Sequence, residues 1–404
     1  MTAPAPSEPR RRVLLVAPRF PFPSLSGGEK WTASLARGLA RRHEVSLFSF
    51  AVRGAEAQQT ALAMSLEGRE LNKVYLLPRP ASAAGQGLPL LPAMYWSPEA
   101  AERLAEAAAE TRAEVVHILF SEMACYAAAL PPALPAVYTE IDSSYLYPWK
   151  YYLRETAGLQ GYLMLREFFR GRAYARRHYG RFAAATAITA SDGADIQPYL
   201  RSPLAAVTPN AVDPEEFAPA APPERKDGEI LFVGHYPHYP NEDAALRLAR
   251  RIFPLVKAER PDATLVLAGS CPTAVVKALA GAYTAVPGTV ADLRPALWRA
   301  QVFAAPVRYG LGAKGKILEA FAAGLPVVAS REAAAGIEGA IDGEHLLAAA
   351  SDREFAAAAA RLLGDPALRG RLAAAALDLV KKRFSFSDVV SSVSGVYAKV
   401  LDGR

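Results

Sequence analysis

The chain has 404 residues, of which 51% are hydrophobic and 21% are charged, and its formal net charge at pH 7 is +6. This composition is typical of globular proteins and excludes collagen-like, low-complexity and disulfide-scaffold chains. Because a domain usually has ~100–200 residues, the length predicts two domains. The positive charge is divided between both halves of the chain, so the sequence does not indicate a nucleic-acid-binding protein.

The cysteine content and the apolar runs bear on the compartment. Cys125 and Cys271 are the two cysteines, and we expect both to be reduced, as in cytosolic proteins. The apolar run Val13–Ala17 is shorter than the ~7–15 residues of a signal peptide. No window reaches the ~18 apolar residues of a membrane span. We therefore expect residues 1–12 to be a disordered lead and the protein to be cytoplasmic, at most peripheral at the inner face of the membrane.

The first half alternates short apolar runs with helical patterns. A Gly/Pro-rich loop, Pro18–Gly28, follows the first run, and Glu29–Arg42 then predicts a helix. Trp31 and Leu35 recur at a spacing of four, on one face of that helix. The alternation predicts a parallel sheet covered by helices. The expected strands are Val13–Ala17, Val45–Phe50, Val74–Leu77, Val115–Leu119, Ala136–Thr139 and Thr186–Thr189.

The pattern restarts after a segment rich in Pro, Ala and charge, residues 218–228, which we interpret as a linker. Asn241 can cap the first helix beyond it. The sequence thus predicts an α/β fold with two tandem Rossmann-like doubly wound domains, over residues 13–217 and 229–384, with a C-terminal helix over 385–404 that packs back on the first domain. Ligands of such sheets bind beyond the carboxyl ends of the strands, so we expect the site in a cleft between the domains. The further expected strands are Ile230–Val233, Thr264–Ala268, Tyr283–Val286, Val302–Ala305 and Val327–Ala329.

The most informative segment joins a glycine-rich loop to a helix. Gly310 and Gly312 expose backbone amides where the helix begins, and a helix N-terminus attracts phosphate. Lys314 and Lys316 add positive charge there. Glu319 follows Lys316 by three residues, so both can share one helix face. These residues suit a nucleoside diphosphate sugar, with lysines for the diphosphate and a carboxylate for a ribose diol. The glycines and the following Gly-Leu-Pro favour this interpretation over a solvated Lys–Glu pair.

This segment resembles the signature of retaining glycosyltransferases of family 4 with the GT-B fold. In the first half, the loop Arg19–Gly28 resembles the family's Gly-rich loop. Ser121–Ala124 and Glu140–Ser143 resemble a branch associated with bacterial exopolysaccharide and surface-glycan assembly. Segments similar to the family's donor domain and domain junction are Phe232–Gly234, Tyr239–Asn241, Ala268–Gly269, Gly288–Asp292 and Pro209–Asp213.

The resemblance implies transfer of a hexose from a nucleoside diphosphate sugar to an acceptor hydroxyl, with retention of configuration and without a metal or other cofactor. It places the nucleotide in the second domain and a glycan, lipid-linked or small-molecule acceptor in the first. Lys316 would stabilise charge on the departing diphosphate. The residues expected to be catalytic are Lys316, Glu319, Asp142 and Glu140. The residues expected to bind substrate are Gly27, Gly28, His117, Gly234, Gly269, Val290, Gly312, Lys314, Lys316 and Glu319.

The donor side departs from the family pattern at two positions. Leu311 stands where the first of two glutamates is common, so Glu319 remains alone. Gly234-His235-Tyr236 stands where an arginine and a lysine often follow the first donor strand. We therefore expect Lys314 and Lys316, with the helix terminus, to neutralise the phosphates. The missing glutamate keeps open a degenerate, non-catalytic partner, and a sugar-nucleotide 2-epimerase shares the architecture.

The acceptor side carries Glu140 and Asp142 near a strand end where many relatives have a histidine. If the strand continues, both side chains project from one side and could hold or deprotonate an acceptor hydroxyl. The alternative is a solvated loop with an Asx turn through Asp142. His117 closes another strand, and the resemblance places that strand end near the sugar, although a lone strand histidine is more often structural. Gly27 and Gly28 either form a tight turn or let the backbone approach a ligand.

Arginine and aromatic residues crowd together from Arg166 to Arg181 in one helical stretch. This stretch could lie on an anionic bilayer or on a lipid-diphosphate acceptor. We favour the alternative of an arginine-laced surface helix with its aromatic side chains in the core.

Overall fold

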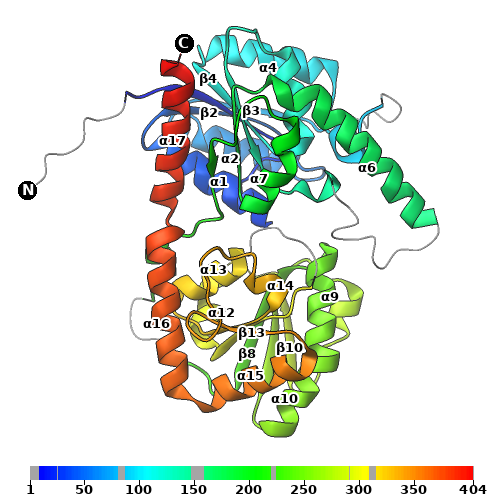
Figure 1. Ribbon diagram of the computed structural model, residues 1–404, viewed down its shortest axis with the longest axis vertical. Helices are drawn as coiled ribbons and strands as arrows, with labels where there is room; N and C mark the ends of the chain where they lie inside the picture. Colours follow the sequence, from blue (N-terminus) through cyan, green and yellow to red (C-terminus); the bar gives the residue numbers. More distant parts are fainter. Residues whose placement is uncertain are drawn as a thin grey trace, which may run out of the picture. The chain divides into compact units, whose positions relative to one another are not determined.

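The computed structural model describes residues 9–24, 26–80, 87–146, 159–219, 224–290, 292–308 and 315–403. The chain forms two compact units, one of Met1–Pro209 with Val389–Arg404 and one of Asn210–Asp388. In each unit, helices flank a single parallel sheet (Figure 1). No helix in the described ranges is long and apolar enough to cross a membrane.

The first unit holds a seven-stranded sheet in the order β3-β2-β1-β4-β5-β6-β7. Its strands are β1 (Arg12–Ala17), β2 (Glu44–Phe50), β3 (Val74–Leu77), β4 (Val115–Leu119), β5 (Ala136–Glu140), β6 (Ala184–Ala187) and β7 (Ala206–Val207). All paired strands are parallel, and they are mostly apolar because helices cover both faces. The predicted doubly wound α/β fold is confirmed. The strand order reverses between β1 and β4.

Helices and turns of this unit connect successive strands. They are α1 (Gly27–Ala40), α2 (Glu56–Leu66), α3 (Leu90–Ala93), α4 (Pro98–Glu110), α6 (Leu159–His178), α7 (Ala190–Ile196) and the 3₁₀ turns η1 (Ser121–Ala129), η2 (Ser143–Leu146), η3 (Tyr179–Arg181) and η4 (Gln197–Tyr199). Ser26 caps α1: its hydroxyl accepts from the Glu29 amide, and the Glu29 carboxylate accepts from the Ser26 amide. This capping box begins the helix at Gly27, two residues before the predicted start.

The second unit holds a six-stranded parallel sheet in the order β10-β9-β8-β11-β12-β13. Its strands are β8 (Glu229–His235), β9 (Thr264–Ser270), β10 (Thr284–Gly288), β11 (Val302–Ala305), β12 (Val327–Ser330) and β13 (Leu347–Ala349). Its helices are α8 (Pro214–Phe217), α9 (Tyr239–Arg247), the π-helical η5 (Leu248–Ile252), α10 (Phe253–Glu259), α11 (Ala274–Lys277), α12 (Arg294–Arg299), α13 (Gly315–Ala322), α14 (Arg331–Ala334), α15 (Asp352–Gly364) and α16 (Pro366–Arg383). The strand order reverses between β8 and β11.

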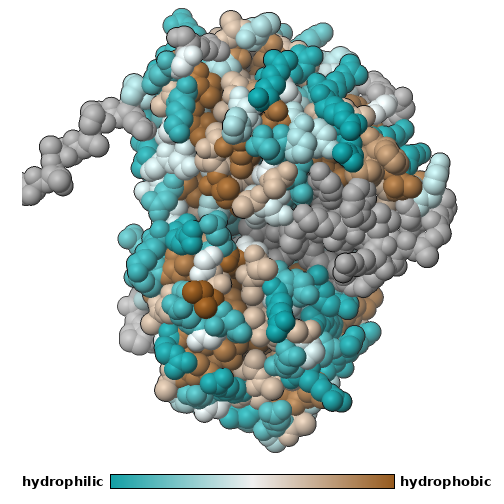
Figure 2. All heavy atoms as spheres, viewed as in Figure 1, coloured by the Kyte–Doolittle hydropathy of each residue, from teal (hydrophilic) through white to brown (hydrophobic). Residues whose placement is uncertain are grey.

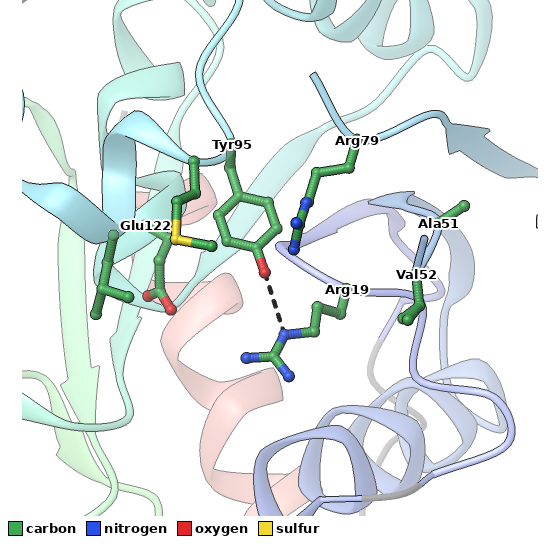
Figure 3. Close-up of a pocket in the computed structure, with 8 residues that line it drawn as sticks. Arg19, Ala51, Val52, Arg79, Tyr95 and Glu122 are labelled. Atoms are coloured by element: carbon green, nitrogen blue, oxygen red, sulfur yellow. Dashed lines mark hydrogen bonds between the residues drawn. The ribbon is translucent and has the colours of Figure 1, made fainter. Parts of the chain in front are cut away.

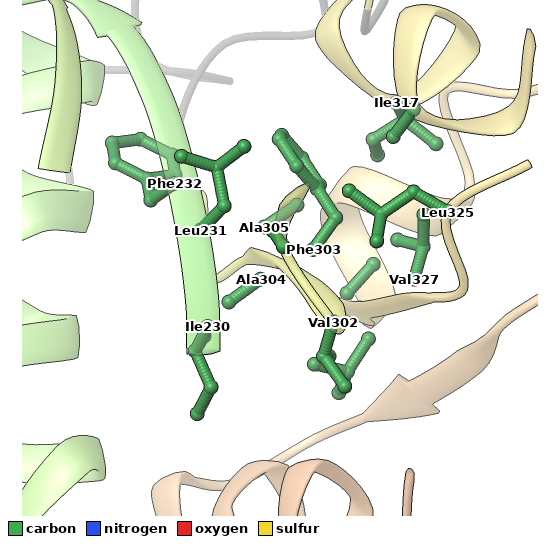
Figure 4. Packing of buried hydrophobic residues seen from close by; sticks show 14 of the residues in the cluster. Ile230, Leu231, Phe232, Val302, Phe303, Ala304, Ala305, Ile317, Leu325 and Val327 are labelled. Carbon is green, nitrogen blue, oxygen red and sulfur yellow. The ribbon is translucent and has the colours of Figure 1, made fainter. Parts of the chain in front are cut away.

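The core of the second unit fixes α13 against the sheet. Phe303 of β11 and Ile317 of α13 are fully buried in one apolar cluster with Leu231 (Figure 4). Truncating such a buried aromatic side chain typically costs ~3–5 kcal/mol. The helix stops where the sequence predicts, because Gly324 has φ +62° and the Leu325 amide bonds back to Ala320. Packing of its apolar side chains against the sheet therefore fixes the position of α13.

The segment interpreted as a linker belongs to the second unit in its described part, residues 224–228. The Arg225 guanidinium donates to the carbonyls of Ala300 and Gly324, each at 2.7 Å. The two units instead divide after Pro209. A Pro- and charge-rich composition indicated a loop, but it did not reveal that one arginine would tie the loop to the core.

The C-terminal helix α17 (Phe386–Asp402) contributes its residues from Val389 onward to the first unit. Two histidines of that unit contact it. His43 Nε2 lies 2.8 Å from Ser394 Oγ, and His117 Nδ1 lies 2.6 Å from Tyr397 Oη. Both histidines are buried, so these polar contacts lie inside the packed interface.

Candidate functional site

In a doubly wound sheet, ligands bind beyond the carboxyl ends of the strands at the point where the strand order reverses. In the second unit this switch point lies between β8 and β11, and in the first unit it lies between β1 and β4. We describe the two switch points separately.

At the end of β8, Gly234 pairs in register with Gly269 of β9. A Cβ atom on Gly269, whose φ is +135°, would lie 1.9 Å from the Gly234 carbonyl oxygen. A Cβ atom on Gly234 would lie 3.0 Å from that of Asn241. Backbone packing thus requires glycine at position 269, whereas Gly234 makes room for the Asn241 side chain. Contact of either glycine with a substrate stays a prediction.

Asn241 orients the lysine of the donor motif. It lies inside α9, after a helix start at Tyr239 that Pro240 favours, so it does not cap the helix as expected. Its Nδ2 donates to the His235 carbonyl at 2.9 Å, and its Oδ1 accepts from Lys316 Nζ at 2.5 Å. The Lys316 ammonium also lies 4.7 Å from the centre of the Phe232 ring. The lysine is therefore held beside the carboxyl end of β8.

Four further residues on the donor side were predicted to bind the substrate. Glu319 lies one turn after Lys316 on α13 and is half-buried, so the two share a helix face as predicted. Gly312 and Lys314 lie outside the described residues. Val290 is half-buried and follows β10, two strands from the switch point. The diol contact of Glu319 and the base contact of Val290 stay predictions.

Arg308 is a cation at this switch point that the sequence analysis missed. It follows β11, and its guanidinium forms a two-pronged ion pair with Asp243 of α9, at 2.7 and 3.2 Å. No motif marks it, and only the sheet order brings it to the side of β8. In the described ranges, no group of three or more His, Cys, Asp or Glu side chains is arranged to hold a metal ion.

In the first unit, Gly27 and Gly28 lie in the first turn of α1 and not in the loop before it. A Cβ atom on Gly28 would lie 3.0 Å from the Phe120 ring, whereas one on Gly27 would meet no atom within 4 Å. Phe120, just after β4, has φ +67°, a strained value for a residue with a side chain. The switch point thus combines a strained backbone with open space at Gly27, as close approach of a ligand requires.

Glu140 ends β5 and is fully buried. Its carboxyl group accepts from the hydroxyls of Tyr138, Tyr145 and Tyr179 and from the next two backbone amides, at 2.9–3.2 Å. Burial, with Asp192 nearby, raises the pKa of Glu140 to about 8. Five protein partners and full burial favour a structural role over deprotonation of an acceptor.

Asp142 lies outside β5 and is exposed, so the condition for the proposed Glu140–Asp142 pair, that the strand continues to Asp142, is not met. Because the strand stops at Glu140, the two carboxylates have different surroundings and do not form a pair on one strand face. The chain turns at this point because Ser143 is tied to Asp192, with both its amide and its hydroxyl donating to that carboxylate. A role of Asp142 toward the acceptor stays a prediction.

His117 is fully buried in β4. Its Nδ1 contacts Tyr397 Oη and its Nε2 contacts Thr139 Oγ1, each at 2.6 Å. Burial lowers its pKa to about 3, so the ring is neutral near pH 7. With both ring nitrogens engaged in the core, His117 joins the sheet to α17, and this arrangement does not support the predicted sugar contact.

The structure reveals a pocket of about 210 Å³ in the first unit that sequence analysis did not find. Arg19, Arg79, Tyr95 and Glu122 turn toward one space (Figure 3). Ala51, Val52, Leu91 and Met94 complete its lining. Arg19, Ala51, Arg79 and Glu122 come shortly after the carboxyl ends of β1, β2, β3 and β4, whereas Tyr95 comes after α3. Polar side chains close behind strand ends were the signal that could have identified most of them.

The arginine-rich stretch Arg166–Arg181 lies on helix α6 and, from Tyr179 onward, in the 3₁₀ turn η3. Phe168 and Tyr174 are buried, as expected for a surface helix, and Glu167 pairs with Arg170 at 3.2 Å. Other apolar side chains near its N-terminal end are exposed, and Figure 2 shows an apolar surface there. They are Tyr162, Leu163, Leu165 and Phe169. Contact of this helix with a membrane stays a prediction.

Comparisons with known proteins agree with this geometry. Residues 25–216 match the model of the Glycosyltransferase Family 4 family, and residues 227–365 match that of Glycosyl transferases group 1. No protein of curated function has a sequence similar enough to count as a relative.

Solved structures share the fold at low sequence identity. Sucrose-phosphate synthase from Thermosynechococcus elongatus has a TM-score of 0.72 at 15% identity, over 98% of this chain and 100% of that one. HepE from Anabaena, in complex with UDP and glucose, has a TM-score of 0.66 at 14% identity, over 96% and 100%. TarM has a TM-score of 0.71 at 8% identity, over 97% and 100%. Since the two family models together span most of the sequence and both sheets match the fold, the chain is a family-4-like glycosyltransferase of the GT-B fold.

Proposed function

We propose that this glycosyltransferase transfers a hexose with retention of the anomeric configuration and without a metal ion. The observation that carries the proposal is the placement of Lys316, which Asn241 holds beside the end of β8. A diphosphate at this switch point would meet an ammonium whose position is fixed before it binds. Such fixed charge lowers the barrier for departure of the diphosphate, because it stabilises the negative charge that develops there.

The cations of the chain support metal independence. Lys316 and Arg308 both come after β11, and each contacts a residue of α9, the helix that follows β8, at the switch point of the second unit. Arg308 shares its charge with Asp243, and its planar guanidinium can bind a phosphate through two parallel hydrogen bonds. Two such side chains supply the kind of charge that a metal ion provides to a diphosphate in other transferases.

The donor and the configuration are supported by similarity. HepE structures with UDP and with UDP-glucose share this fold, so UDP-glucose is the first donor to test. Retention of configuration rests on the resemblance of the donor motif to retaining enzymes. Neither the identity of the donor nor the retention of configuration follows from the geometry of a single residue.

The test measures thermal stabilisation by UDP, GDP, dTDP and ADP, each with Mg²⁺ or with EDTA. We expect one diphosphate to raise the Tm equally under both conditions. Stabilisation lost on adding EDTA would contradict metal independence, and no stabilisation by any diphosphate would contradict the donor site. With an acceptor in hand, ¹H NMR of the first product would give its anomeric configuration, and inversion would overturn that part of the proposal.

A further inference from the structure

We propose that the pocket of the first unit binds the acceptor through an anionic group, a carboxylate or a phosphate, next to an acceptor hydroxyl. The inference rests on the proposed function, since it takes the ligand of this pocket to be the acceptor. The residues that carry it are Arg19, Arg79, Tyr95 and Glu122 (Figure 3).

The position and size of the pocket suit one small polar group. Arg19, Ala51, Arg79 and Glu122 come shortly after β1, β2, β3 and β4, so the pocket lies at the carboxyl edge of the sheet, where ligands of this fold bind. The other part of its lining comes from α3 and the residues after it. Its volume is about 210 Å³, which is enough for a sugar ring or a group of similar size.

Arg79 supplies a cation whose backbone is restrained. Pro78 and Pro80 flank it and fix the backbone on both sides. Its guanidinium lies 6.0 Å from the centre of the Tyr95 ring. In the part of the chain that the structure describes, no carboxylate forms an ion pair with Arg79. An anionic group entering the pocket would therefore supply the partner that this guanidinium lacks there.

Arg19 adds a second guanidinium, which two neighbouring side chains hold in place. Its Nε donates to Tyr95 Oη at 3.1 Å, and one terminal nitrogen lies 3.6 Å from the Glu29 carboxylate. The remaining N–H groups of the guanidinium can bind an anion in the two-pronged geometry typical of carboxylates and phosphates. Because Glu29 offsets part of the charge of Arg19, Arg79 makes the larger difference to anion binding.

Tyr95 and Glu122 make the opposite side suitable for a hydroxyl. The Tyr95 hydroxyl oxygen already accepts a hydrogen bond from Arg19. Among the described residues, no acceptor receives the hydrogen bond that this hydroxyl can donate. Glu122 accepts from one side chain, Ser121, at 3.1 Å, and burial raises the pKa of its carboxyl. Glu140, by comparison, has five donors and no room for another group. A ligand hydroxyl beside Glu122 and Tyr95 would complete both sets of hydrogen bonds.

The experiment measures binding of charged and neutral probe pairs by calorimetry, in the full chain saturated with the nucleoside diphosphate that stabilises it. The pairs are methyl glucuronide with methyl glucoside, and glycerol 3-phosphate with glycerol. The variant is Arg79→Gln, and the matched control is Arg53→Gln, an exposed arginine that does not line the pocket. Its guanidinium donates to the Pro80 carbonyl at 3.5 Å, so this control also reports the effect of disturbing the chain next to Arg79. Arg19→Gln serves as the second variant, and melting curves confirm folding.

We expect the wild type to bind at least one charged probe about tenfold or more tightly than its neutral partner. Arg79→Gln should remove most of that difference, in keeping with the loss of a charged hydrogen bond, whereas Arg53→Gln should retain it. Preference for the glucuronide identifies a carboxylate, and preference for glycerol 3-phosphate identifies a phosphate.

Equal binding of both members of each pair, or equal losses in Arg79→Gln and Arg53→Gln, would overturn the proposal. Failure of the proposed function has a different signature, because the Tm is then unchanged by every nucleoside diphosphate. In that case the same pairs are titrated without nucleotide, and a charge preference lost in Arg79→Gln would still establish an anion pocket that does not serve sugar transfer.

Discussion

The carboxyl edge of the second sheet holds Lys316 and Arg308 with polar partners on α9, whereas the edge of the first sheet holds Arg79 facing a pocket. Both edges lie at or beside the switch point of a doubly wound sheet. In the second unit the cations are oriented by an amide and a carboxylate of the protein. In the first unit the cations and the half-buried carboxyl group of Glu122 line a space that a ligand can fill. The same sheet order thus supports a prearranged charged surface in one unit and a pocket in the other.

The glycines near the two switch points also differ in the space around them. In the second unit two strand ends meet at Gly234 and Gly269 with no space for a Cβ atom, whereas in the first unit Gly27 borders open space. The glycines of the two units therefore have different roles. Gly234 and Gly269 allow their strands and α9 to pack closely, whereas Gly27 leaves space for a ligand to approach the backbone.

The largest expected effect tests this difference in the glycines. Gly269→Ala places a Cβ atom 1.9 Å from a backbone oxygen at a positive φ, so we expect a loss of about 3 kcal/mol or more in unfolding free energy. Gly28→Ala should cost less, because the Phe120 ring can shift. Gly370→Ala, in an open position of α16, should stabilise by roughly 0.5–1 kcal/mol. Urea denaturation gives all three values, and equal losses at Gly269 and Gly28 would remove the contrast.

The second effect tests the prearranged cation. Lys316→Ala should reduce turnover ~10²-fold or more, because it removes the charge that stabilises the departing diphosphate. Lys381→Ala, which removes an exposed lysine of α16, should leave turnover within about twofold. Steady-state rates of donor consumption, measured with acceptor present, give the turnover of both variants. A near-native rate in Lys316→Ala would reject the assignment.

A third, smaller effect concerns Glu319. Glu319→Ala should weaken binding of the nucleoside diphosphate by roughly tenfold, as expected for the loss of a charged hydrogen bond to a ribose diol. Glu332→Ala, on the exposed first turn of α14, is the matched control. Calorimetric titration measures both. Unchanged affinity in Glu319→Ala would remove the diol contact and leave Lys316 as the principal donor residue of α13.

The smallest effect concerns the buried carboxyl group of the first unit. The pKa of Glu140 is raised to about 8 in the folded protein, so its contribution to stability is complete at low pH and is lost as the pH rises through 8. Between pH 7 and pH 8 the wild type should lose roughly 1 kcal/mol that Glu140→Gln does not lose. Melting curves at the two pH values measure the difference. Both proteins retain His117, whose pKa is lowered to about 3, so its opposite pH dependence cancels. Parallel pH dependences would show that Glu140 is ionised throughout.

The sequence by itself determined the elements and the donor motif. Apolar runs between helical patterns identified most strands, because strands covered on both faces must be apolar throughout. The short strands β7 and β13 lack enough residues to produce such a pattern. Spacing along one helix also placed Lys316 and Glu319 together, since helical geometry is local.

Only the tertiary structure decided which polar residues are available to a ligand. Glu140 and His117 have the residue types of a catalytic site, yet hydrogen bonds to distant residues occupy them inside the core. Arg79 belongs to no motif, and the motif segment that contains Glu122 does not indicate a pocket. The two residues line one pocket because the strands before them, β3 and β4, end at the same edge of the sheet. Burial and hydrogen-bond partners depend on contacts between residues far apart in the chain, and these contacts exist only after the sheets have formed.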